Sequence, residues 1–166
     1  MALTTRIAST MDATQTSVGD LGTATFTAGL TKTYNWTSGT GTNQADRMWS
    51  DTGTITASST TSLDLAGTGL LDPYGVAVVF VKLRMLRLEA ATGNTNNVLV
   101  TRPASNGVPL FSAAGDQAIV QPGGVLEMVW PAGITVTAGT GDLIDLVNSG
   151  AGTSVDYSIM LIGTSA

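Results

Sequence analysis

The sequence contains neither cysteine nor histidine, and charged residues make up 11% of the chain, against a usual share of about 25%. Without cysteine, no disulfide framework and no thiolate metal site can form. Without histidine, the Ser/His/Asp and Cys/His nucleophile arrangements are excluded, as are zinc sites built on histidine. The stability of the chain must therefore come from packing or from assembly.

The few charges also limit the partners of the chain. The formal net charge is −5 and the sequence pI is near 4.3, so the chain as a whole does not attract phosphate backbones, and we expect no nucleic-acid partner. The N-terminus lacks an apolar segment of secretory-signal length, and the longest apolar run, residues 75–81, is far shorter than the ~20 residues that cross a bilayer. We expect a soluble chain with no membrane partner.

The 166 residues, 43% of them apolar, are enough for one domain with a substantial core. Residues 1 to about 22 are polar and keep no period for long, which predicts an N-terminal arm over residues 1–22 and one sandwich domain over residues 23–166. From residue 23 onward, short alternating segments lie between turns rich in Gly, Pro and Asn. They predict about eight strands, over residues 23–36, 48–65, 76–89, 97–101, 118–121, 125–130, 142–147 and 155–163.

This pattern predicts an all-β fold, because the helix-like candidates are single turns around residues 43–48 and 66–71. An immunoglobulin domain is usually smaller and has a Cys, Trp, Cys pattern that is absent here, so a jelly-roll β-sandwich fits best. Within residues 76–89 the apolar positions change phase after Met85, where Leu86 and Leu88 take over. A one-residue phase change predicts a β-bulge near Met85 or Leu86.

Carboxylates could still support glycoside hydrolysis, so the acidic residues are the remaining catalytic candidates. Asp142 and Asp145 lie three residues apart, which puts them on opposite faces of a strand, and Glu127 lies on an outward strand face. We interpret these residues, with Glu89, as surface or turn-forming side chains, and we predict no catalytic residues.

Calcium binding is the next hypothesis, because acidic residues in loops could converge on a hard cation. No EF-type loop is present, so we interpret them as turn-forming side chains and predict no metal site. The glycine-rich pieces AGTG, NSGAG and SGTGTG lack the P-loop ending and the βαβ setting of a dinucleotide site, so no cofactor is expected. The loop carboxylates are Asp64, Asp72, Asp116 and Asp142.

Lys82, Arg84 and Arg87 bring three of the seven basic residues together within six positions. They could form an outward strand face that resists edge pairing, or a patch that docks on an acidic protein surface. The three tryptophans could form a sugar-stacking platform or serve as core or interface anchors. They are Trp36, Trp49 and Trp130.

Two segments, SLDLAGTGLLDPYGVAVVFVKLRMLRLEAATGNTNNVLV and QPGGVLEMVWPAGITVTAGTGDLIDLVNSGAGTSVDYSIMLIGTSA, carry a resemblance over about Ser62 to Ala166. In their order of a DPYG turn, a long strand, PGG, a TAGTGD turn and a terminal IGTSA, they resemble small virion proteins of tailed bacteriophages that decorate or cement the capsid. The resemblance implies a jelly-roll body, a homotrimer, and attachment to the major capsid protein. It carries no catalytic residues.

We therefore expect a structural virion protein, made in the host cytoplasm and located on the capsid exterior, that stabilises the capsid lattice. Lys82, Arg84 and Arg87 are its candidate capsid-docking patch. The alternative is a carbohydrate- or receptor-binding jelly-roll module of a phage head or tail fibre. A carboxylate-only glycosidase is a third hypothesis, and we expect the chain not to be an enzyme.

Overall fold

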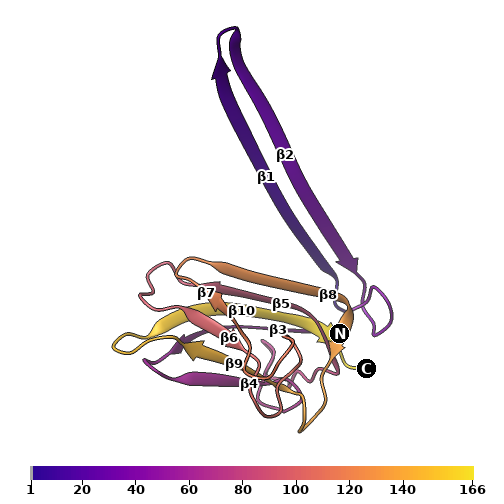
Figure 1. The fold of residues 1–166 in the computed structure, drawn as a ribbon. Helices are drawn as coiled ribbons and strands as arrows, with labels where there is room; N and C mark the ends of the chain where they lie inside the picture. The colour runs from indigo at the N-terminus through magenta and orange to yellow at the C-terminus, as the bar shows by residue number, and fades with distance from the viewer. Residues whose placement is uncertain (1) are drawn as a thin grey trace.

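Ten β-strands make up the computed structural model, which describes residues 2–166, and no helix lies in that range. With no helix in residues 2–166, none there could span a membrane. Figure 1 shows a sandwich and a long hairpin that rises away from it. The hairpin strands are β1 (Thr5–Gly19) and β2 (Gly22–Trp36). The sandwich strands are β3 (Arg47–Ile55), β4 (Thr60–Asp64), β5 (Lys82–Ala90), β6 (Val98–Thr101), β7 (Gln117–Val120), β8 (Val125–Thr135), β9 (Leu143–Asn148) and β10 (Val155–Thr164).

The sandwich consists of two antiparallel four-stranded sheets. The order β3-β10-β5-β8 forms what we call the arm-side sheet, and the order β4-β9-β6-β7 forms the far sheet. Successive strands alternate between the two sheets, except that β6 and β7 share one. The predicted all-β sandwich is confirmed, and eight strands in this order are consistent with the predicted jelly roll.

The core lies between the two sheets because alternate residues of their strands point inward. In β10, Tyr157, Ile159 and Leu161 are buried, whereas the residues between them are exposed. Full burial of one such aliphatic side chain contributes about 1.5–3 kcal/mol. The far sheet contributes inward-facing residues in the same way, among them Val98, Val100, Ile144 and Leu146.

A β-bulge interrupts β5 at Arg84. Against β10, Met85 pairs with Ile162 and Leu83 with Gly163, so Arg84 is the extra residue. The pairing of β5 with β8 is interrupted at the same place, where residues 130–133 of β8 lie unpaired. A Cβ atom on Gly163 of β10 would collide with the carbonyl oxygen of Lys82. Only glycine allows this close approach of the backbones. The predicted bulge near Met85 is confirmed, one residue earlier in the chain.

The N-terminal arm extends further along the chain than residue 22. Every residue from Thr5 to Gly19 pairs with a residue of β2, and the turn consists of Asp20 and Leu21. The predicted boundary falls at this turn, and β2 belongs to the arm and not to the sandwich. The reason is that the alternation over residues 23–36 is the same whether a strand pairs within a sandwich or within a separate ribbon.

Three local predictions differ from the structure. The single strand predicted over residues 48–65 is two strands, β3 and β4, which lie in different sheets. The sequence predicts a strand from Val76, but β5 begins at Lys82. Val78 and Phe80 are buried before it, and their amides donate to the carbonyls of Leu70 and Leu65 at 2.7 and 2.8 Å. The helix-like turns predicted around residues 43–48 and 66–71 are not helical, because loop and bridge hydrogen bonds use these backbone groups instead.

The inward face of β10 predicts different losses of stability at two neighbouring positions. Leu161→Ala should lower the free energy of unfolding by about 2–5 kcal/mol, because it leaves a cavity between the sheets. Met160→Ala, on the outer face of the same strand, should cost much less. Urea denaturation of both variants measures the difference, and equal losses would contradict the assigned inward face.

Candidate functional site

The hairpin of β1 and β2, hereafter the arm, has one apolar face and one hydroxyl face. Paired residues in an antiparallel ribbon lie on the same face, and successive pairs alternate between faces. The register therefore places the pairs Met11–Leu30 and Gln15–Phe26 on one face. Eight of the nine threonines between residues 5 and 36 lie on the opposite face: Thr10, Thr14, Thr16, Thr23, Thr25, Thr27, Thr31 and Thr33.

The apolar face of the arm is open to solvent over most of its length. Met11, Phe26 and Leu30 are 69%, 67% and 75% exposed. Single exposed apolar residues are ordinary on protein surfaces, but a contiguous row of them marks an interaction site. The arm is therefore the strongest candidate for a binding surface in the part of the chain that the structure describes.

A small apolar cluster joins the arm to the body. Ile7 and Trp36 belong to the apolar face and are buried at the base of the arm, with Met85 and Ile162 of the arm-side sheet. Tyr34 packs beside this cluster, and its ring centroid lies 6.0 Å from that of Trp36. Aromatic pairs at this separation contribute about 0.5–1.5 kcal/mol beyond the area they bury. The cluster anchors the arm to the sandwich.

The apolar face continues from the arm onto the body. A recess of about 390 Å³ lies where residues 3–8 meet the outer face of the arm-side sheet. Met48, Met85, Met160 and Ile162 line its apolar side. Methionine side chains adapt to different partners because they are unbranched and polarizable. The recess extends the binding surface from the arm onto the sheet.

The structure does not bring Lys82, Arg84 and Arg87 together as one exposed patch. Arg84 is 3% exposed, and its guanidinium donates to the carbonyl oxygens of Gly41, at 2.9 Å, and of Pro131. The bulge points this residue into the protein, where it ties the loop after the arm to β8. The placement of Arg84 in a docking patch is thus corrected: a buried guanidinium cannot contact a capsid surface.

The other two members of the predicted patch, Arg87 and Lys82, have different surroundings. Arg87 makes ion pairs of 2.7 Å with Glu89 and 2.9 Å with Glu127 on the outer face of the sheet. The hydrogen bond with Glu89 is the main reason that the pKa of Arg87 is raised, while partial burial acts against it. Lys82 is half-buried and lines a recess with Arg84 and residues 40–43, which Arg87 does not reach. A docking role for Lys82 and Arg87 stays a prediction.

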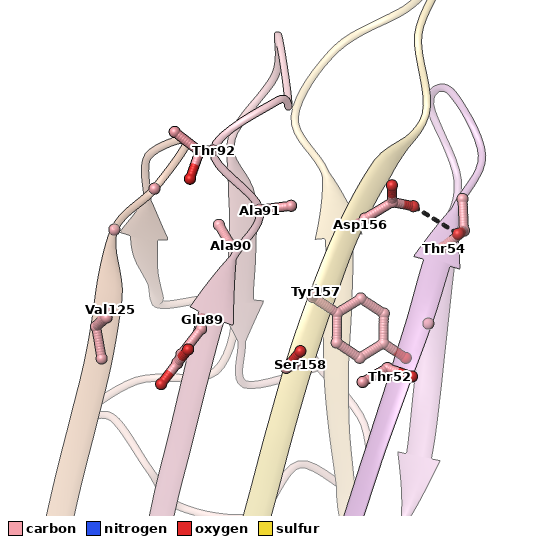
Figure 2. A pocket seen from close by; sticks show the side chains of 13 residues that line it. Thr52, Thr54, Glu89, Ala90, Ala91, Thr92, Val125, Asp156, Tyr157 and Ser158 are labelled. Atoms are coloured by element: carbon pink, nitrogen blue, oxygen red, sulfur yellow. Dashed lines mark hydrogen bonds between the residues drawn. The ribbon is translucent and has the colours of Figure 1, made fainter.

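The end of the arm-side sheet distant from the arm holds a polar hollow of about 520 Å³ (Figure 2). Thr52 and Ser158 lie across from Glu89 on its floor, and the Asp156 carboxylate accepts a hydrogen bond of 2.5 Å from Thr54 at its rim. Hydroxyl and carboxylate groups of this kind could bind sugar hydroxyls. No exposed aromatic ring accompanies them among the lining residues, so stacking on a sugar ring is not provided.

Tyr157 borders this hollow but belongs to the core. It is 6% exposed, and its hydroxyl lies against Gly53, where a Cβ atom would come within 2.7 Å of the oxygen. Burial, helped by the charge of Asp51, raises the pKa of the Tyr157 hydroxyl above its usual value of 10.0. The folded state therefore favours the neutral phenol.

The remaining candidate residues have structural roles. The carboxylates of Asp64, Asp72, Asp116 and Asp142 each accept a hydrogen bond from a backbone amide two to four residues away, which confirms them as turn-forming. Asp142 is buried, and Asp145, half-buried on β9, accepts a hydrogen bond from Ser62. Within residues 2–166, no three acidic side chains gather in a way that could hold a metal ion.

The tryptophans are anchors and do not form a surface platform. Trp36 and Trp49 are 2% and 6% exposed, and Trp130 is partly buried against the main core. The interpretation of the tryptophans as core anchors is confirmed. Sequence reasoning missed the apolar face of the arm, although Phe26, Leu30, Tyr34 and Trp36 already show the period of two that builds half of it.

Comparisons of the chain with protein-family models, with curated protein sequences and with solved structures find no match. The geometry of the arm and of the body is therefore the basis for the function proposed below.

Burial of Arg84 predicts a structural loss at a charged residue. Arg84→Ala should lower the free energy of unfolding by about 1–3 kcal/mol, because two carbonyl oxygens lose their donor. Lys82→Ala, two residues away and half-exposed, should change it by less than about 0.5 kcal/mol. Urea denaturation of both variants is the measurement. An Arg84 variant of unchanged stability would contradict the role of Arg84 in holding the loop after the arm to β8.

The raised pKa of Tyr157 predicts a loss of stability at high pH. The contribution of this group is present below its unfolded-state pKa of about 10 and is lost as the pH rises through the higher folded-state pKa. Tyr157→Phe should therefore reduce the fall in unfolding free energy above pH 10, relative to the parent chain. Tyr74→Phe, at an exposed tyrosine, is the control and should leave the fall unchanged.

Proposed function

We propose that this chain is a structural binding protein that attaches to the exterior of a tailed-bacteriophage capsid, as a homotrimer, and stabilises the lattice of the major capsid protein. The observation that carries the binding function is the arm, a ribbon of 32 residues, 5–36, whose apolar face is exposed. The resemblance over residues 62–166 supports the choice of a capsid as the partner.

The chemistry of the body favours binding over catalysis. Its carboxylates form turns or pair with hydroxyl and guanidinium groups, and the chain has no histidine or cysteine. Function then depends on surfaces. A protein that binds one state of a shell and not another stabilises that state by RT ln(1 + [L]/Kd) per site, about 2.7 kcal/mol at a hundred times Kd. Repeated over a lattice, modest contacts of this size can stabilise a whole particle.

A carbohydrate- or receptor-binding module is the alternative, favoured by the hydroxyl- and carboxylate-lined hollow of Figure 2. The burial of Trp36 and Trp49 weighs against it, since neither offers a stacking surface. A glycan array separates the two proposals. Specific saccharide binding that is lost in Glu89→Ala, without affinity for capsids, would favour the alternative.

Shortening the arm should weaken attachment to particles without unfolding the body. Replacing residues 11–30 by Asn-Gly joins Thr10 to Thr31, which are paired, by a two-residue turn and keeps the anchoring cluster intact. Because the exposed apolar face is removed, occupancy on parent particles that lack the protein should fall at least about tenfold, the change that corresponds to 1.4 kcal/mol.

Cosedimentation with such particles measures occupancy, and the urea midpoint of the shortened chain controls for folding of the body. Full occupancy by the shortened chain would show that the arm is not needed for attachment. Absence of binding by the complete chain to the capsid would contradict the proposed function itself.

A further inference from the structure

We propose that the apolar face of the arm is a self-association surface, on which the arms of two or more copies of this chain pack together with their threonine faces outward. In the oligomer the apolar face is covered by other copies, so its part in attachment is to join the copies that bind the capsid together. This inference rests on the proposed function for that part, but its test requires no capsid. Four observations support it: the exposure of the arm, its charge, the sizes of its side chains and its area.

The apolar face of the arm is exposed, and a two-stranded hairpin needs another surface to cover such a face. A single two-stranded hairpin is at best marginally stable in water, because it buries too little apolar surface to offset an ordering cost of about 1–2 kcal/mol per residue. Beyond its base, residues of both arm strands are exposed on both faces. Paired strands of this length are stable only if another surface covers the apolar face.

The charge of the arm favours a neutral partner. Between residues 5 and 36, Arg6 and Lys32 balance Asp12 and Asp20, so the arm has no net charge, and the net charge of −5 belongs to the body. Of these four residues, only Lys32 is paired onto the apolar face, where its Nζ atom lies 5.4 Å from the centroid of the Tyr34 ring. Beyond Lys32, from the pair Met11–Leu30 to the pair Gly19–Gly22, the apolar face carries no charge. A strongly acidic or basic partner would find no complementary charge there, and a second copy brings no repulsion there.

The sizes of the side chains make the apolar face complementary to itself. From Met11 outward, rows of large residues alternate with rows of small ones along the ribbon, and each row is two residues, or about 6.8 Å, from the next. Two such faces shifted by one row place large side chains over small ones, which is how packed sheets interdigitate. The large rows are Met11–Leu30 and Gln15–Phe26, and the small rows are Ala13–Ala28 and Ser17–Ala24.

The arm face supplies a large part of the area that an association needs. From Ser9 to Gly19 the ribbon is about 35 Å long and, with two strands, about 10 Å wide. Two such faces cover at least about 700 Å² when treated as flat, and corrugated side-chain surfaces bury more, which approaches the about 1,200 Å² of small stable interfaces. The recess beside Met160 adds to this area on the body.

Light scattering of the purified chain is the first test. The complete chain should have a molar mass of two or three times 16.9 kDa at about 10 μM. Phe26→Asp should raise the dissociation constant at least about 30-fold, the effect expected for an interface hot spot. Thr25→Asp places the same charge on the opposite face, opposite Thr16, and should leave the molar mass unchanged.

Cysteine cross-linking is the second test, and it does not depend on any destabilising change. Because the chain has no cysteine, Ala28→Cys introduces a single thiol on the apolar face, and Thr27→Cys introduces one on the threonine face. A thiol-reactive cross-linker with a spacer of about 10 Å, the distance between packed sheets, should join copies through the first much faster than through the second. A monomeric complete chain, equal effects of the two aspartate variants, or faster cross-linking through Thr27→Cys would each overturn the inference.

The two proposals can fail separately. A monomeric chain that still decorates particles would overturn self-association and the homotrimer, and would leave attachment to the capsid standing. An oligomer joined through its arms that does not bind particles would support this inference and contradict the proposed function.

Discussion

The structure depends on one constraint: the apolar face of a two-stranded ribbon loses free energy of stabilisation when it is exposed to water, so another surface has to cover it. At its base the arm meets this constraint within the chain, where Ile7 and Trp36 pack on Met85 and Ile162. Further out, Met11, Phe26 and Leu30 have no cover from the described residues. The base of the arm is thus packed against the body, and the rest of its apolar face is exposed and available to a partner.

The sandwich provides the rigid support that such an arm needs. Its two sheets bury a continuous core, and the bulge at Arg84 turns a guanidinium inward to hold the loop after the arm and the strand β8 together. The same bulge lies next to Met85, which contacts the base of the arm. An irregularity in one strand therefore helps to fix where the arm leaves the body.

The all-β class and most of the sandwich strands could be predicted because period-two alternation and glycine-rich turns are local signals, as in β9 and β10. The pairing of β2 could not, because alternation shows which face a residue is on but not which strand lies beside it. The burial of Arg84 depends on carbonyl groups from Gly41 and Pro131, which are distant in sequence. The apolar face of the arm could not be predicted, because it is formed by residues of both strands and is recognised only when their register is known.

Hydrogen exchange of the arm amides tests the central claim most directly, because exchange reports how often a segment opens. If arms of different copies cover one another, protection of residues 23–33 should increase with protein concentration, while protection of β10 in the sandwich core stays constant. Arm amides that exchange equally fast at every concentration would show that no second copy covers this face, and would contradict the account.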